Sequence, residues 1–406
     1  MNINELISKQ RPGFTLDQEF YCSDAIFEEE VQKVFPNHWI SLDHASRIPN
    51  AGDYFLASIV GESIIVVRGK DGEIHAHYNV CRHRGSKVCV EPEGNVSRLT
   101  CPYHAWTYAL DGKLVAARLM HEGFRKEDYG LKPCHLRVHD GLIFINLNIG
   151  DAPDFDEMMA PLLPFLDMHG LDKAKIAHRE VYPTDANWKL VLDNFFECYH
   201  CAPSHPEYSR VHSAAKLMAF GAGPDSGSED AMKEFEPEMK EWQARAQELG
   251  HFTGSHAARG VGSFQGAMRA PIKQGSLSET KDGTPVSTLM GKFKDFDGGQ
   301  TAVSFNPFGT MLMSNDFAVL LRFIPHSATK SDMEVIWLVN SDAEEGKDYN
   351  VEKLIWVWDV TTKQDKDIIE WNRAGVMSRH YEPGPYSTQE AASAKLIQWY
   401  LSQLSG

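Results

Sequence analysis

The sequence predicts an α+β protein, with a small all-β domain followed by a larger domain of antiparallel sheet and packed helices. Two observations lead to this prediction. Short β-rich runs broken by Asp-Gly pairs fill residues 46–150, a pattern typical of β-hairpins. Four more strand-like runs lie within residues 301–340, and a long helical pattern follows over residues 351–380.

The elements can be assigned in order along the chain. Residues 1–45 are expected to be partly helical and to pack on the larger domain, because apolar residues recur on one face of residues 23–35. The larger domain, residues 151–406, is expected to begin with a short helix over residues 154–160. A longer helix is predicted over residues 187–201. Residues 215–300 are polar, contain several glycines and lack clear periodicity, so we expect mobile segments that cover a pocket.

Composition excludes several classes of protein. The net charge is −16, with 56 acidic and 40 basic residues, which argues against a nucleic-acid partner. No apolar stretch is long enough to cross a membrane, and the N-terminus lacks a signal-peptide pattern, so we expect a cytoplasmic protein. The seven cysteines do not form a disulfide pattern. Five of them are expected to be free thiols: Cys22, Cys89, Cys134, Cys198 and Cys201.

The remaining two cysteines belong to a metal-binding pattern. Cys81 and His83 are followed, after seventeen residues, by Cys101 and His104, which gives C-x-H-x17-C-x2-H. Two cysteines and two histidines suit a [2Fe–2S] cluster in which the cysteines hold one iron and the histidines the other. A structural zinc site is the alternative, although zinc sites usually pair cysteine with cysteine and histidine with histidine. Here each loop carries one of each type.

A second pattern lies in the larger domain. On the helix predicted over residues 187–201, Glu197 and His200 are three residues apart and would project to the same side. Pro203 should end this helix, and the following turn could bring His205 beside His200. Two histidines and one carboxylate with open positions form the facial triad of non-heme Fe(II) oxygenases. A histidine pair alone is weak evidence, but an iron–sulfur domain upstream could supply such a site with electrons.

The segments around both patterns resemble one known family. CRHRGSKVC and CPYHAWTYALDGKL resemble the Rieske domain of ring-hydroxylating oxygenases, and NWKLVLDNFFECYHCAPSHPEYS resembles their catalytic motif. The second ligand loop lacks the extra cysteine of the respiratory-chain Rieske subunit, and Cys89 is misplaced for the other one. The resemblance implies a Rieske [2Fe–2S] cluster on Cys81, His83, Cys101 and His104. It further implies a helix-grip catalytic domain that binds mononuclear non-heme Fe(II) through His200 and His205.

The resemblance also indicates the third iron ligand and a linking residue. Family members carry the carboxylate on a late helix, in a pattern of Asp, then Glu and then Gly at five-residue steps. Asp365, followed by Glu370 and Gly375, fits this pattern, and Asp367 is the rival. An acidic residue three positions before the first histidine, here Glu197, would link the iron site to a cluster histidine of the neighbouring subunit. The alternatives for Glu197 are a surface ion pair or direct contact with iron.

These expectations combine into a function. The chain would be the oxygenase component of a Rieske monooxygenase that uses O2. Its electrons would come from a separate NAD(P)H-dependent reductase, because the sequence has no nucleotide or flavin motif. The resemblance implies a homotrimer. Residues 197–201 (ECYHC) and 205–207 (HPE) look like the branch that oxidises small quaternary ammonium compounds such as choline, carnitine and betaines. N-demethylation or C–N cleavage would then follow.

Trp356, Trp358 and Trp371 are candidates for an aromatic cage around a cationic substrate, although tryptophans at such spacing are often core residues.

The sequence leaves two other functions open. The enzyme alternative is an oxygenase that hydroxylates aromatic substrates, whose pocket would be largely apolar. The alternative outside enzymes is an electron carrier or redox sensor, which leaves His200, His205 and more than half of the chain unexplained.

Overall fold

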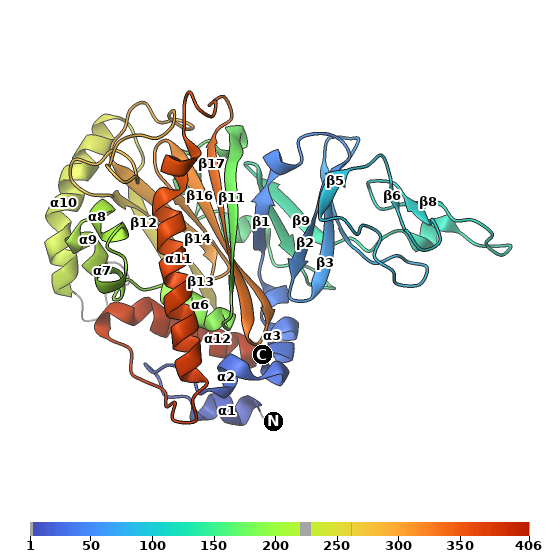
Figure 1. Ribbon diagram of the computed structural model, residues 1–406, viewed down its shortest axis with the longest axis horizontal. Coiled ribbons are helices and arrows are strands. Elements are labelled where there is room, and N and C mark those ends of the chain that lie inside the picture. Colours follow the sequence, from blue (N-terminus) through green and yellow to red (C-terminus); the bar gives the residue numbers. More distant parts are fainter. Residues whose placement is uncertain (1–2, 220–228, 261, 406) are drawn as a thin grey trace. The chain divides into compact units, whose positions relative to one another are not determined.

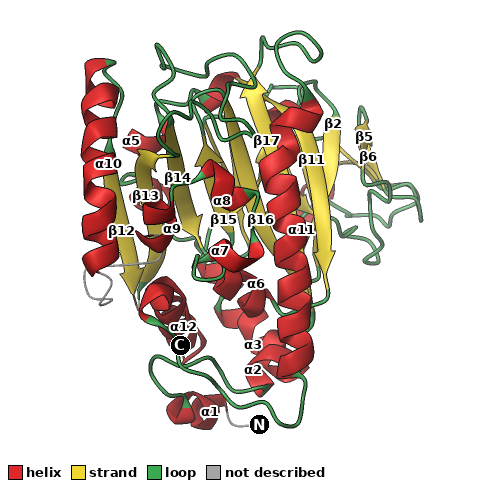
Figure 2. Cartoon of the chain, turned by 60° about the vertical axis from the view of Figure 1, so that its left-hand side comes forward, coloured by secondary structure: helices red, strands yellow, loops and turns green. Residues whose placement is uncertain are grey.

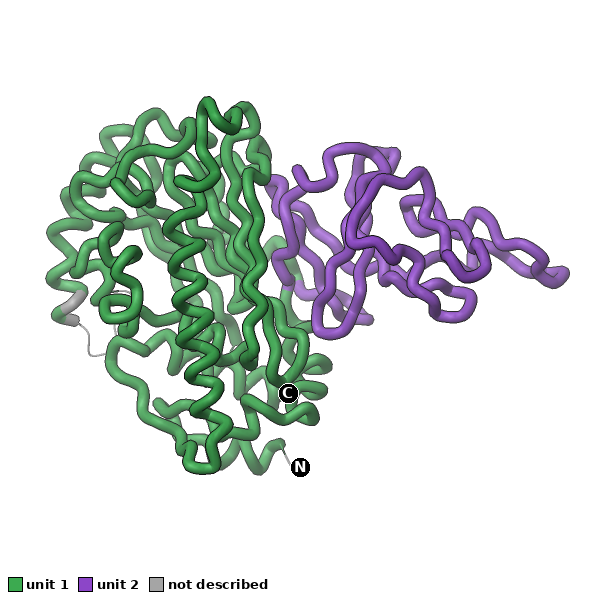
Figure 3. The backbone as a smooth tube through the Cα atoms, viewed as in Figure 1, with its two compact units in different colours: residues 1–38, 154–406 green, residues 39–153 purple. Residues whose placement is uncertain are grey.

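The computed structural model describes residues 3–219, 229–260 and 262–405 of the chain. The chain divides into two compact units, which Figure 3 shows in two colours. One unit contains residues Trp39–Pro153, and the other combines Met1–His38 with Asp154–Gly406. The N-terminal segment therefore belongs to the same unit as the C-terminal part of the chain. No helix in the described ranges is long and apolar enough to cross a membrane.

The unit of residues 39–153 is built from three antiparallel sheets, and its all-β character is confirmed. The sheet orders are β1-β10-β9, β4-β3-β2-β5 and β6-β7-β8. The strands are β1 (Ile40–His44), β2 (Asp53–Ile59), β3 (Glu62–Arg68), β4 (Ile74–Tyr78), β5 (Glu93–Asn95), β6 (Leu99–Thr100), β7 (Thr107–Tyr108), β8 (Leu114–Ala116), β9 (His135–His139) and β10 (Leu142–Asn146). Gly72, in the predicted Asp-Gly turn between β3 and β4, has a φ of 87°, which glycine adopts without strain.

The larger unit contains one seven-stranded antiparallel sheet with the order β11-β17-β16-β15-β14-β13-β12. The strands are β11 (Ala174–Thr184), β12 (Gly254–Gly260), β13 (Ser263–Pro271), β14 (Gly299–Asn306), β15 (Gly309–Met313), β16 (Phe317–Ser327) and β17 (Lys330–Asn340). Strand β15 and most of β16 and β17 are buried at consecutive positions, so both faces of the centre of the sheet are covered.

Helices lie against this sheet. Helix α11 (Val351–Val376) packs along β11 and β17, and the short helices α7 to α9 lie on the same side of the sheet (Figures 1 and 2). The remaining helices are α1 (Ile3–Lys9), α2 (Glu19–Cys22), α3 (Asp24–Lys33), α4 (Phe155–Met159), α5 (Leu163–Leu166), α6 (Trp188–Phe195), α7 (Cys201–Ser204), α8 (Tyr208–Val211), α9 (Ala214–Ala219), α10 (Glu229–Glu248) and α12 (Ala391–Ser405). The buried face of α11 includes Trp358, Thr361, Thr362 and Ile369, as its periodicity predicts.

A buried carboxylate ties three of these helices together. Glu30 on α3 is fully buried and accepts hydrogen bonds from Trp188 Nε1 (2.7 Å), Lys189 Nζ (2.5 Å) and Tyr400 Oη (2.6 Å). These partners lie on α6 and α12. The ion pair between Glu30 and Lys189 therefore lies at the centre of the packing of α3 against α6 and α12.

One sequence-based expectation for this unit is wrong, and another missed regular elements. The helix predicted over residues 187–201 ends at Phe195, because the Glu197 side chain accepts the backbone N–H groups of Tyr199 and His200. Within residues 215–300, of which 220–228 and 261 lie outside the described residues, the structure has helix α10 and strands β12 and β13, where the sequence showed no periodicity. Lys216, Met268, Ala270 and Gln300 from this range line a cavity. Pro237 lies inside α10 and argues against a helix there, and β13 is nearly continuously buried, so it shows no alternation of buried and exposed residues.

Candidate active site

Two loops in the unit of residues 39–153 present the predicted cluster ligands in the same backbone arrangement. In each loop the cysteine N–H donates to the carbonyl five residues later, at 2.8 Å. The cysteine carbonyl in turn accepts the N–H four residues later, at 3.0 Å. That fourth residue has a positive φ in both loops, 79° at Gly85 and 57° at Ala105. Cys81 and Cys101 therefore begin two equivalent tight turns.

The four side chains form two close pairs. Cys81 and Cys101 are each 2% exposed, whereas His83 and His104 are exposed and their Nδ1 atoms lie 3.2 Å apart. No three of these four ligand atoms, all in described residues, lie within 4.8 Å of one another. A single zinc ion would need all four within about 4 Å. The arrangement fits a two-iron cluster, with the cysteine pair at the buried iron and the histidine pair at the surface.

Neighbouring side chains support this site. The Tyr108 hydroxyl lies 3.2 Å from Cys81 Sγ, and the Trp106 ring stacks on His83 with centroids 4.9 Å apart. Burial raises the pKa of the Cys81 thiol, so a thiolate there depends on a bound metal. Hydrogen bonds to cluster sulfur atoms are a recognised means of tuning a reduction potential.

The larger unit brings His200, His205 and Asp365 together as a group that could hold a metal. His200 Nε2 and His205 Nε2 lie 3.0 Å apart, and Asp365 Oδ1 lies 3.3 Å from the first and 2.9 Å from the second. Metal–ligand bonds of roughly 2.1 Å at right angles separate the ligand atoms by roughly 3.0 Å. The three distances therefore match one face of an octahedron. The rival carboxylate, Asp367, is exposed and outside this group.

The chemistry of these residues also fits a metal ion. Asp365 Oδ1 is buried and makes no well-aligned hydrogen bond despite the two nearby ring nitrogens. Burial disfavours a charge on His200, yet contacts with Asp365 and Glu197 raise its pKa to about 9. Burial likewise raises the pKa of Asp365, but His200 and His205 outweigh it, so the net shift is downward. The site therefore attracts positive charge, which a divalent metal would supply in place of a proton.

Each histidine is oriented through the ring nitrogen that faces away from the group. Glu197 accepts from His200 Nδ1, and Gln364 Oε1 accepts from His205 Nδ1 at 2.9 Å. Gln364 is itself held by Glu207, at 2.8 Å. Both Nε2 atoms are thereby left with lone pairs that face the metal position. Glu197 is thus placed behind a ligand, rather than at the metal itself.

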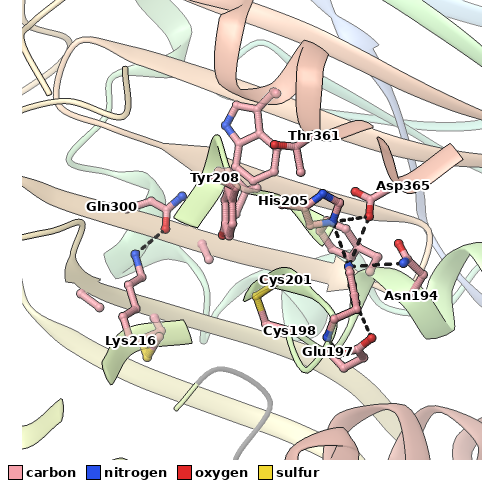
Figure 4. Close-up of a pocket in the computed structure, with 17 residues that line it drawn as sticks. Asn194, Glu197, Cys198, Cys201, His205, Tyr208, Lys216, Gln300, Thr361 and Asp365 are labelled. Carbon is pink, nitrogen blue, oxygen red and sulfur yellow. Dashed lines mark hydrogen bonds and ion pairs between the residues drawn. A yellow bond between two sulfur atoms is a disulfide. The ribbon is translucent and has the colours of Figure 1, made fainter. Parts of the chain in front are cut away.

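A cavity of about 70 Å³ opens onto the three ligand residues, as Figure 4 shows. Its aromatic walls are Phe195, Tyr208 and Trp358, and its other apolar residues come mainly from strands β13 to β15. Its lining is completed by Asn194, Glu197, Cys198, His200, Cys201, His205, Lys216, Met268, Ala270, Gln300, Ala302, Leu312, Thr361 and Asp365. Segments far apart in sequence therefore form one pocket.

Only one of the three predicted cage tryptophans lines this cavity. Trp358 does so, and its ring lies 5.7 Å from that of Tyr208. Trp371 is 71% exposed, and Trp356 lies under Lys281, outside the cavity lining. The position of each tryptophan on α11 explains why only Trp358 lines the cavity. Trp358 lies on the buried face of α11, as does Thr361, which also lines the cavity.

The expectation of free thiols is wrong for two cysteines. Cys198 and Cys201 form a disulfide with a Cα–Cα distance of 4.9 Å, and both line the cavity. Cys198 lies in the turn between α6 and α7 and Cys201 begins α7, so the two cysteines lie within the Cα–Cα range of a disulfide. Cys22, Cys89 and Cys134 are free, as expected.

Sequence reasoning missed several residues of this site. Gln364 precedes a ligand on α11, and Lys216 and Gln300 gave no motif-level signal, whereas Phe195 lies within the motif that carries the resemblance. Tyr208 lies within the motif that carries the resemblance, but its place in the pocket wall follows only from the three-dimensional arrangement.

Comparisons with known proteins agree with these two sites. The family described as "Rieske [2Fe-2S] domain" matches residues 38–132, and "Ring hydroxylating alpha subunit (catalytic domain)" matches residues 171–406. The chain is 35% identical over 404 residues to the glycine betaine monooxygenase oxygenase subunit of Pseudomonas aeruginosa strain UCBPP-PA14. This match covers 98% of the chain and 91% of that protein. It is also 39% identical over 204 residues to the carnitine monooxygenase oxygenase subunit of Escherichia coli K12, which covers 48% and 54% of the two chains.

Solved structures show the same fold. A quaternary ammonium Rieske monooxygenase, CntA, aligns with a TM-score of 0.72 at 23% identity and covers 98% of both chains. Naphthalene 1,2-dioxygenase with bound indole aligns with a TM-score of 0.71 at 19% identity, over 100% of this chain and 95% of the other. Taken with the sites described above, these matches show that the chain belongs to the Rieske-type ring-hydroxylating oxygenase family, as an oxygenase component that carries a Rieske [2Fe–2S] cluster and a mononuclear iron.

Proposed function

We propose that this oxygenase hydroxylates a small quaternary ammonium compound of the betaine type, with N-demethylation or C–N cleavage as the outcome. The observation that carries this proposal is the wall of the cavity beside His200, His205 and Asp365. Three aromatic rings (Phe195, Tyr208 and Trp358) line it, and aromatic faces attract a quaternary ammonium group through cation–π contacts. The two curated relatives named above are monooxygenase subunits for glycine betaine and carnitine.

The size of the cavity supports a small substrate. A volume of about 70 Å³ is small for a ligand pocket, which favours a compact molecule over a polycyclic one. Binding such a molecule against aromatic walls would exclude water from the reaction site.

Two groups of residues would hold the metal centres, and Glu197 would connect them. His200, His205 and Asp365 would hold iron, and Cys81, His83, Cys101 and His104 would hold the cluster. The two metal centres would supply electrons and activate O2, so that one oxygen atom enters a C–H bond. Hydroxylation of an N-methyl carbon gives a hemiaminal, which collapses to formaldehyde and the demethylated amine. Glu197 would orient His200 and accept a hydrogen bond from a cluster histidine of a neighbouring subunit.

The partners follow from the same proposal. A separate NAD(P)H-dependent reductase would supply the electrons, and three copies of the chain would form a ring in which each cluster serves the next iron. The exposed edges of His83 and His104 support such a transfer, because electrons can leave the cluster through them. A cytoplasmic location is part of this proposal, since pyridine nucleotides are available there.

The aromatic-hydroxylation alternative has less support. It predicts a largely apolar pocket without a cation cage. Most of this lining is apolar, but its aromatic rings can bind a cation, and Lys216 and Gln300 add groups that bind a charged molecule. A biphenyl 2,3-dioxygenase alpha subunit from Rhodococcus jostii is 33% identical over 263 residues, but this match covers 62% of the chain and 54% of that protein. The electron-carrier alternative is opposed by the catalytic-domain match over residues 171–406.

A single-turnover experiment tests the proposed function. The iron-loaded protein would be reduced chemically and mixed with air and a panel of quaternary ammonium compounds, and products would be followed by proton NMR. Loss of an N-methyl signal with formaldehyde formed in proportion to iron is the expected result. If every compound survives while the cluster is reoxidised, the substrate class is wrong and aromatic substrates become the next panel.

A further inference from the structure

Four Lys and Arg side chains are buried among the residues that the structure describes, and one of them differs from the others. Three are paired directly with a carboxylate: the pairs are Lys189–Glu30, Arg269–Asp297 and Arg322–Glu334. Lys216, which is 5% exposed, forms no ion pair within the described ranges. Its Nζ donates instead to the amide oxygen of Gln300, at 2.9 Å.

The nearest acidic network does not neutralise Lys216 directly. Glu279 is 1% exposed and accepts from His212 Nε2 (2.8 Å), Gln300 Nε2 (2.7 Å) and Trp358 Nε1 (3.2 Å). Because Gln300 donates its amide N–H to Glu279, its amide oxygen is turned toward Lys216. Gln300 is thus fixed as an acceptor on one side and a donor on the other.

Lys216 therefore retains unused hydrogen-bonding capacity. An ammonium group has three N–H donors, and Gln300 accepts one of them. Burial lowers the pKa of Lys216 to about 8, against the opposing charges of Glu279 and Glu238, so the ammonium form still predominates at neutral pH. A buried ammonium without a direct counter-ion is unfavourable, and an incoming anion would remove that penalty.

The position of Lys216 relates this charge to the substrate. Lys216 and Gln300 lie on the opposite side of the cavity from His205 and Asp365, with Tyr208 between them (Figure 4). A molecule that spans the cavity would therefore place one end at the ammonium of Lys216 and the other beside the metal ligands. Tyr208 lies along the path between these two ends, and the Trp358 ring lies 5.7 Å from the Tyr208 ring.

We propose that Lys216 and Gln300 form the binding site for a carboxylate group of the substrate. The substrate is then a zwitterion, with its acidic end at Lys216 and its quaternary ammonium end against the aromatic walls and the iron site. The alternation of charge explains why a pocket for a cation contains a buried lysine: the substrate carboxylate lies between the two positive groups. This inference rests on the proposed function and specifies which quaternary ammonium compounds are preferred.

Equilibrium binding to the anaerobic, iron-loaded protein separates the two claims. The probes are glycine betaine and its primary amide, which has nearly the same shape and the same ammonium group but no negative charge. Calorimetric titration of the unmodified protein should show that glycine betaine, the acid of this pair, binds roughly 10- to 100-fold more tightly than its amide. This is the range expected for one charge-assisted contact. This comparison needs no variant to fold.

The variants assign the effect to Lys216. In Lys216→Met the preference for the acid should fall to about onefold, and Lys216→Arg should retain part of it. Lys233→Met is the matched control, because Lys233 is an exposed lysine on α10 that does not line the cavity at the metal. Its acid-to-amide ratio should equal that of the unmodified protein.

Each result has a distinct meaning. If acid and amide bind equally well to the unmodified protein and both are oxidised, the carboxylate site is wrong and the proposed function stands. If Lys216→Met keeps its folded spectrum and the full preference for the acid, Lys216 is not the anchor. If neither compound binds or is oxidised, the proposed function is wrong, and the carboxylate site that rests on it is wrong as well.

Discussion

Glu197 offers a sensitive test of how the iron site is organised. Its carboxylate accepts from His200 Nδ1 with one oxygen and from the N–H groups of Tyr199 and His200 with the other. Glutamine has a single acceptor oxygen. In Glu197→Gln, if that oxygen keeps the backbone contacts, the amide N–H faces His200 Nδ1 and forces the proton onto Nε2, the atom that should face the metal.

The expected cost follows from this change of tautomer. Removing the partner of a metal-ligating histidine typically lowers metal affinity by roughly 10- to 100-fold, or about 1.4 to 2.7 kcal/mol. We therefore predict a loss of this size in Glu197→Gln, measured by anaerobic Fe(II) titration of protein that retains its cluster. Glu197→Asp should lose less, because an anion at this position still favours the proton on Nδ1.

Two results would refute this reasoning. Unchanged iron affinity in Glu197→Gln would show that the carboxylate does not orient His200. Complete loss of the mononuclear iron in Glu197→Asp, with the cluster absorbance intact, would show that Glu197 is itself a ligand.

Two further predictions concern the supporting contacts. Gln364→Leu removes the acceptor of His205 Nδ1, so Fe(II) affinity should fall roughly tenfold while the cluster absorbance stays unchanged; unchanged affinity would contradict this role. Glu30→Gln leaves Lys189 buried without a counter-charge and should reduce the free energy of unfolding by about 3 to 5 kcal/mol. Glu29→Gln on the same helix breaks only an exposed pair and should cost less than about 1 kcal/mol in the same denaturation assay; equal losses would contradict the buried-pair account.

The sequence predicted those parts of the site in which chemistry demands fixed residues at short spacing. Cys81 with His83 and Cys101 with His104 lie in two short loops, so spacing alone indicated the cluster. Asp365 is assigned from a family pattern on a helix, and the structure places it next to the buried, uncharged face of that helix.

The remainder depends on contacts that no local pattern contains. The helix was expected to continue to residue 201, but a side chain, Glu197, takes up the backbone donors that would extend it. The disulfide between Cys198 and Cys201 was not expected either, because a spacing of three residues does not distinguish a disulfide from two free thiols. Lys216 on α9 and Gln300 on β14 meet through a hydrogen bond between side chains that are 84 residues apart in the sequence.

Iron stoichiometry tests the central claim most directly. We predict about three irons per chain in the purified protein, two in the cluster and one mononuclear. Asp365→Asn should retain about two, with an unchanged cluster spectrum, and Asp367→Asn should retain three. If Asp365→Asn kept the third iron, or if the unmodified protein bound only the cluster irons under iron-replete conditions, then His200, His205 and Asp365 would not be the metal site.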